Sequence, residues 1–125
     1  KPDVIAVLDW ELTTLGDPVA DFVNHLVPWY MPALGDRVSS LEGFDLKQMG
    51  IPTEEEYIEQ YCRLTNRESI GYLNFYKAYC LWRLAAIYQG IIKRVEDGTA
   101  ASADATTDTE IPNKLAARAC NLVET

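Results

Sequence analysis

Basic residues are scarce in this chain of 125 residues. It contains 11 lysines and arginines against 19 aspartates and glutamates, which gives a formal net charge of −8 at pH 7. Nonspecific binding to nucleic acid or to an anionic membrane surface needs a cationic surplus that neutralises phosphates. The composition therefore disfavours nucleic acid and anionic membranes as partners.

Long hydrophobic runs are also missing. The most apolar stretch, residues 78–92, is interrupted by Arg83, whereas a membrane-spanning helix needs about 20 largely uncharged residues. We therefore expect no membrane span. We also expect no secretory signal peptide. The chain opens on Lys1 directly before a predicted strand. This start leads us to expect a fragment of a longer protein.

Cysteine and histidine are few. Cys62, Cys80 and Cys120 are far apart and form no CxxC pair, so neither a zinc site nor a redox motif is indicated. All three lie in apolar helical patterns, which predicts buried free thiols in a reducing compartment and hence a cytoplasmic protein. The one histidine, His25, lies in a helical segment, where a polar surface position is favoured over a catalytic role.

One strand and a first helix are predicted near the start of the chain. The β-branched run VIAVL, residues 4–8, is typical of a buried strand. Asp17 followed by Pro18 marks a helix start, because an aspartate side chain caps free backbone N–H groups and proline fits the first helical position. One strand cannot form a sheet. Its partner strands are therefore either missing from the fragment or supplied by a second copy.

Three further helices follow, so the fold class is mostly α. Thr53 with Glu56 three residues later forms a capping box. The longest helix is expected over 69–95, residues 99–109 are expected to be a mobile linker, and helical spacing returns over 110–124. The predicted apolar side of the longest helix consists of Leu73, Tyr76, Cys80, Leu84, Ile87, Tyr88, Ile91 and Val95.

Four carboxylates follow the predicted strand, at Asp9, Glu11, Asp17 and Asp21. A carboxylate at a strand end is well placed to hold Mg²⁺ against a phosphate, since Mg²⁺ is usually bound by one or two carboxylates, phosphate oxygens and water. Asp9 and Glu11, two apart on an extended segment, would point the same way. Alternatively, these two form an exposed turn, Asp17 is only a cap and Asp21 is a surface charge. Spacing alone does not decide between these interpretations.

Two stretches of the sequence resemble a known family. The stretch IAVLDWELTTLGDPVADF resembles the metal-binding segment of the aminoglycoside phosphotransferase-like family, within the protein-kinase-like superfamily. It is most similar to the branch that includes the phosphotransferase domain of acyl-CoA dehydrogenase family members 10 and 11. The later stretch CLWRLAAIYQGIIKRVEDGTA, residues 80–100, also resembles that branch. The resemblance covers roughly residues 4–100 and implies the C-terminal helical subdomain of a kinase-like α+β fold.

The resemblance implies roles for the acids. Asp9 would be the main Mg²⁺ ligand for the phosphates of ATP, and Glu11 would be an accessory metal group. Asp21 would hydrogen-bond back to the catalytic loop and hold its shape, while Asp17 caps the helix. Trp10 would take the place of the aromatic residue in the kinase motif and pack inward. Mg²⁺ and ATP are therefore the expected cofactor and phosphoryl donor.

Several parts that the family needs are absent from this sequence. It has no glycine-rich nucleotide loop, no strand lysine and no His-x-Asp-x-x-x-x-Asn loop. In the family these parts precede the equivalent of residue 4, so we expect no catalytic residue in this fragment. The domain divides into a metal-binding strand and loop (1–17), a helical substrate-side subdomain (18–98), a linker (99–109) and a C-terminal helix (110–124).

Two functions from different classes remain. In the first, the parent protein is a small-molecule kinase that transfers the γ-phosphoryl group of ATP to a hydroxyl of an aminoglycoside, a choline-like or homoserine-like compound or a hydroxyacyl-CoA. In the second, the chain is a non-catalytic scaffold or interaction module. In either case an apolar surface left exposed on the fragment would favour self-association. Candidates for the acceptor side, unless they simply pack in the core, are Trp29, Tyr30, Tyr76, Tyr79, Trp82 and Arg83.

Overall fold

The computed structural model describes residues 3–11, 13–35 and 40–124. Within these ranges the chain forms five helices and no β-strand. The helices are α1 (Pro18–His25), α2 (Val27–Tyr30), α3 (Glu54–Thr65), α4 (Leu73–Glu96) and α5 (Glu110–Glu124).

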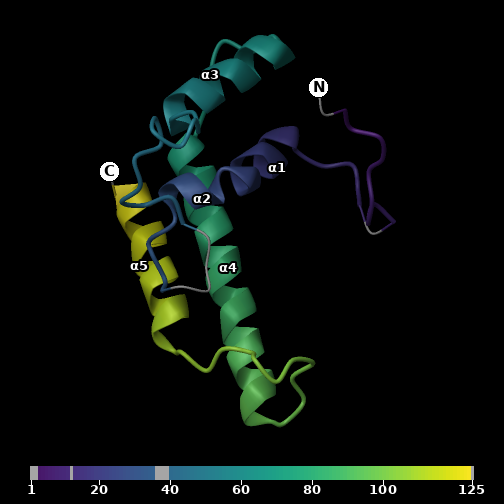
Figure 1. Ribbon diagram of the computed structural model, residues 1–125, viewed down its shortest axis with the longest axis vertical. Coiled ribbons are helices and arrows are strands. Elements are labelled where there is room, and N and C mark those ends of the chain that lie inside the picture. The colour runs from purple at the N-terminus through teal and green to yellow at the C-terminus, as the bar shows by residue number, and fades with distance from the viewer. Residues whose placement is uncertain (1–2, 12, 36–39, 125) are drawn as a thin grey trace.

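Helix α4 is the long axis of the molecule, and the other helices are arranged around it (Figure 1). Helix α5 returns antiparallel alongside α4 and makes the most extensive helix–helix contact. Helices α1 and α2 cross α4 toward its N-terminal half, and α3 lies at that same end. None of the helices in the described ranges has the length and apolar character that a bilayer crossing requires.

The first and third helices begin where their capping residues predict. Asp17 is the N-cap of α1, where its Oδ1 accepts a hydrogen bond from Val19 N at 2.9 Å. Thr53 and Glu56 form the capping box of α3, because each side chain accepts a hydrogen bond from the other residue's backbone N–H, at 3.2 and 2.8 Å. Local chemistry therefore sets both helix starts.

Helix α4 is displaced from the predicted 69–95 by residues with left-handed backbone conformations. Tyr72 precedes the helix with φ at 55°, outside the helical region, so the helix begins only at Leu73. At the other end Gly98 adopts φ at 67°, a value that glycine reaches without a Cβ clash. Thr99 N then donates to Arg94 O at 2.8 Å, which closes the C-terminal turn.

The core lies where α4 meets α1, α2 and α5. Val23, Leu26, Leu81 and Leu115 are completely buried. The predicted apolar side of α4 needs correction, because Ile87 is 51% exposed. Helix α4 packs against neighbours on more than one side, so its buried residues do not form a single stripe. They are Lys77, Ala78, Cys80, Leu81, Ala85 and Ile92.

The strand predicted over residues 4–8 is not formed in the described part of the chain. This segment runs away from the helices (Figure 1), and Val4, Ile5, Val7 and Leu8 are all exposed. A strand needs a neighbour for its backbone N–H and C=O groups, and the described residues offer none. The kinase-like fold to which such a strand would belong therefore stays a prediction.

Candidate functional site

The acidic segment before α1, which carries Asp9, Glu11 and Asp17, contains a tight reversal of the chain. Asp9 has φ at 58°, in the left-handed region that aspartate tolerates better than most residues. Directly after it, Thr13 donates to Trp10 O through both its backbone N and its Oγ1, at 3.0 and 2.6 Å. The segment is therefore bent at Asp9. It lacks the extended backbone on which the expected common direction of Asp9 and Glu11 depended.

The metal-ligand hypothesis for Asp9 and Glu11 rests on two exposed carboxylates. The described residues contain no cluster of three or more His, Cys, Asp or Glu side chains that could hold a metal ion. Mg²⁺ needs only one or two protein carboxylates when phosphate oxygens and water complete its shell, and carboxylate oxygen is the donor it prefers. The donor set therefore fits Mg²⁺ bound together with a phosphate ligand, and does not fit an all-protein cage.

The end of this segment is fastened to α4. Tyr76 of α4 donates a short hydrogen bond from its hydroxyl to Asp17 Oδ2, across 59 positions of sequence. This bond, together with the one from Val19 N, lowers the pKa of Asp17. The same bond raises the pKa of Tyr76, because the neutral phenol is the donor. Asp17 therefore does more than cap α1, since it also ties the start of that helix to α4.

Two other expectations for this region concern Trp10 and Asp21. Trp10 was expected to pack inward, but it is 65% exposed, because the described chain places no surface against it. Asp21 is exposed in the first turn of α1, where a negative charge favours the helix dipole. Its proposed hydrogen bond to a catalytic loop involves residues outside this sequence and stays a prediction.

A stack of aromatic side chains joins α1 and α2 to α3. Phe22 lies parallel to Tyr61 with ring centroids 3.7 Å apart, and Trp29 stacks on Tyr57 at 5.3 Å. His25 Nε2 lies 3.1 Å from the Tyr57 hydroxyl, so this histidine has a specific partner. In the sequence these rings stand at helical spacing within each segment. That spacing predicts an apolar face on each helix, but it does not predict that the faces of different helices meet.

The acceptor-side candidates of α2 have structural roles. Trp29 Nε1 donates to Pro52 O at 3.0 Å, which anchors the segment before α3. Tyr30 is a core residue, only 5% exposed, and its hydroxyl donates to Val23 O at 3.0 Å. Burial is the main cause of its raised pKa. In this structure Tyr30 therefore does not line a surface that a substrate could reach.

The acceptor-side candidates Trp82 and Arg83 of α4 have different surroundings. Arg83 Nη2 donates to Asn24 Oδ1 of α1 at 2.7 Å. Trp82 is 61% exposed and lines an apolar groove of about 250 Å³ between α4 and α5. Consecutive residues of a helix lie about 100° apart, so neighbours in sequence serve different faces. The groove is lined by Phe75, Ala78, Tyr79, Trp82, Ala119, Cys120 and Val123.

The cysteines differ in exposure. Cys62 and Cys80 are buried, as expected, and burial raises the pKa of Cys80. Cys120 is exposed, which corrects the expectation of three buried thiols. It is one of the residues that line the α4–α5 groove.

Comparison with known proteins gives relatives of one kind. The chain is 40% identical over 116 residues to mouse acyl-CoA dehydrogenase family member 10, covering 93% of this chain and 11% of that protein. It is 35% identical over 114 residues to human acyl-CoA dehydrogenase family member 11, covering 90% and 14%. It is 28% identical over 111 residues to the probable acyl-CoA dehydrogenase IBR3 of Arabidopsis thaliana, covering 86% and 14%. No protein-family model and no solved structure matches. Acyl-CoA dehydrogenase family members 10 and 11 are thus homologues of this chain, which spans only 11% and 14% of the length of these two relatives.

Proposed function

We propose that this chain is part of an ATP-dependent small-molecule phosphotransferase, which transfers the γ-phosphoryl group to a substrate hydroxyl with Mg²⁺. The observation that carries the proposal is the LDWE…LGDPVAD segment, where a left-handed, exposed Asp9 precedes a helix whose cap is tied to α4. A residue held in a sparsely populated backbone region supports a functional hypothesis for that residue. The homology to acyl-CoA dehydrogenase family members 10 and 11 supports it, since the resemblance points to the same branch.

In this proposal Asp9, Glu11 and Asp17 have distinct tasks. Bound Mg²⁺ would neutralise charge on the phosphate oxygens during transfer. Asp9 would hold that ion, with Glu11 as an accessory group. Asp17 and Tyr76 would keep the segment in place, because their hydrogen bond joins its end to the longest helix. Residues of the full-length protein outside this sequence would supply the nucleotide loop and the group that orients the acceptor hydroxyl.

The acceptor class is a small-molecule alcohol, and we propose a cytoplasmic location. Aminoglycosides, choline-like and homoserine-like compounds and hydroxyacyl-CoA form the substrate panel to be tested. The alternative function is a non-catalytic kinase-like scaffold. A full-length protein without the His-x-Asp-x-x-x-x-Asn loop would favour this alternative.

The test compares two aspartates of the same exposed segment in the full-length parent protein. Asp9→Asn should lower Mg²⁺-dependent ATP turnover by about 100-fold or more, as expected for loss of an interaction that stabilises the transition state. Asp3→Asn is the matched control, since Asp3 is also an exposed aspartate before α1, and it should leave turnover unchanged. Equal activity of both variants would refute the metal role of Asp9. An inactive parent that lacks the His-x-Asp loop would favour the scaffold.

A further inference from the structure

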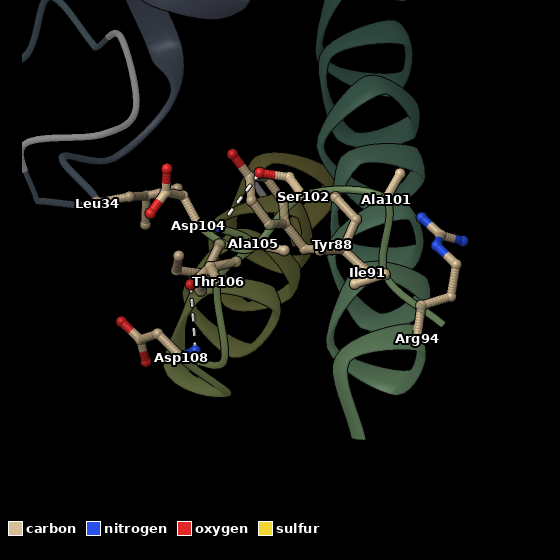
Figure 2. Close-up of a pocket in the computed structure, with 12 residues that line it drawn as sticks. Leu34, Tyr88, Ile91, Arg94, Ala101, Ser102, Asp104, Ala105, Thr106 and Asp108 are labelled. Atoms are coloured by element: carbon tan, nitrogen blue, oxygen red, sulfur yellow. Dashed lines mark hydrogen bonds between the residues drawn. The ribbon is translucent and has the colours of Figure 1, made fainter. Parts of the chain in front are cut away.

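A cavity of about 490 Å³ lies at the end of the molecule where α4 finishes. It is bounded by the C-terminal turns of α4, the loop of residues 100–108, the start of α5 and Leu34 from the segment after α2 (Figure 2). Its volume falls in the range of roughly 300–1,000 Å³ that is typical of small-molecule sites. The acidic segment before α1 lies at a different part of the molecule (Figure 1), so this cavity is separate from the proposed metal site.

The inner lining of the cavity is apolar and continuous with the core. Leu34 and Ile111 are buried core residues, and Tyr88 and Ile91 of α4 add a ring and a branched side chain. On the loop side the lining includes three alanines, at 100, 101 and 105. Because alanine side chains are short, the loop leaves space between itself and α4. The stretch predicted to be only a linker is therefore one wall of a cavity.

The charges around the cavity are separated. Figure 2 shows Arg94 on one side and the carboxylates of Asp104 and Asp108 on the opposite side. Asp108 Oδ1 accepts a hydrogen bond from Glu110 N at 2.9 Å, so this carboxylate is engaged at the start of α5. A ligand's negative group would therefore be favoured only at the Arg94 side.

The Arg94 side chain has no hydrogen bond or ion pair with another residue in the part of the chain that the structure describes. Its neighbour differs: Lys93 pairs with Asp97 at 2.8 Å and with Glu96 at 3.8 Å. The guanidinium lies back along α4, with Nη1 3.6 Å from the position that a Cβ on Gly90 would occupy. Arg94 is therefore available at the cavity edge, and guanidinium is well suited to bind carboxylates through paired N–H groups.

We propose that this cavity binds a small amphipathic carboxylate, with its apolar body against Tyr88 and Ile91 and its carboxylate at Arg94. The apolar floor supplies affinity through burial, and the single available cation among the lining residues fixes the orientation. The proposal does not depend on phosphotransferase activity, because it uses none of the residues of the acidic segment.

The test is calorimetric titration of the full-length protein with 2-naphthoate, compared with the cation 2-naphthylmethylammonium. We expect the carboxylate to bind at least threefold more tightly than the cation. Ala105→Phe should weaken naphthoate binding at least tenfold, because it fills the cavity from the loop. Arg94→Gln should remove the preference for the anion, whereas Lys93→Gln, the matched control on the same helical turn, should retain it.

Circular dichroism of each variant checks that the overall helical content of the protein is unchanged, and Arg94→Gln keeps the test decisive if Ala105→Phe does not fold. The proposal is overturned if naphthoate does not bind, if the cation binds as tightly as the anion, or if a folded Ala105→Phe variant binds naphthoate like the unaltered protein. Equal effects of Arg94→Gln and Lys93→Gln would also overturn it, since they would indicate a general charge effect.

Discussion

Two lysines on α4 make ion pairs of nearly equal length, but we expect very different contributions to stability. Lys77 Nζ lies 2.7 Å from Glu54 Oε1 of α3, with side-chain exposures of 9% and 19%. Lys93 Nζ lies 2.8 Å from Asp97 Oδ1, with exposures of 64% and 50%. Water screens the second pair much more strongly than the first. Burial, rather than distance, should therefore decide the cost of removing each lysine.

The perturbation is Lys77→Met, which keeps the length and helix propensity of the side chain and removes its charge. Removing one partner of a buried pair costs roughly 3–5 kcal/mol, because the other charge is left uncompensated. Glu54 keeps some contact with solvent, so we expect about 2–4 kcal/mol of lost unfolding free energy. The Lys77 ammonium also lies 5.3 Å from the centre of the Tyr30 ring, a contact of about 0.5–2 kcal/mol that is included in this range.

Urea unfolding followed by circular dichroism measures the loss. Lys93→Met is the matched control and should cost less than about 1 kcal/mol, as exposed pairs do. The double variant Lys77→Met with Glu54→Leu should recover most of the loss, because no buried charge is then left alone. The assignment of the cost to burial is wrong if Lys77→Met costs no more than Lys93→Met, or if the double variant is less stable than Lys77→Met alone.

Two other predictions concern the tie at α1 and the α4–α5 contact. The Asp17–Tyr76 bond lowers the pKa of Asp17 from the ordinary value of 3.8, so its stabilisation is present above that value and is lost as pH falls through the lowered pKa. Urea unfolding across this pH range should show a smaller acid-induced loss for Tyr76→Phe than for Tyr79→Phe, a control on the same helix, and equal losses would contradict the bond's role. Leu115→Ala, at a completely buried position of α5, should cost about 2–5 kcal/mol. Val123→Ala, at a position that is 58% exposed, should cost less than about 1 kcal/mol in the same assay.

Much of the helical framework was predictable because its signals are local. Asp17 with Pro18 and Thr53 with Glu56 specify helix starts through hydrogen bonds within one turn. The helix predicted over 110–124 has those same bounds in the structure. The beginning of α4 was not predicted, since the left-handed conformation of Tyr72 leaves no clear mark in the sequence.

The candidate site was predicted less completely, because its geometry depends on residues distant in sequence. The acids were identified from their spacing, but the bend at Asp9 and the bond from Tyr76 were not. Trp82 and Arg83 were both named as acceptor-side candidates, although one lines a surface groove and the other contacts α1.

The sequence by itself determined where most helices lie, which residues cap them and that an acidic segment precedes the first helix. These features depend on interactions within a few residues, so they can be recognised without knowing the fold. Only the tertiary structure decided that Lys77 is buried, that Cys120 is exposed and that the small residues of 100–108 cover a cavity. Burial of a side chain depends on which helix packs over it, and that choice is made by the whole chain.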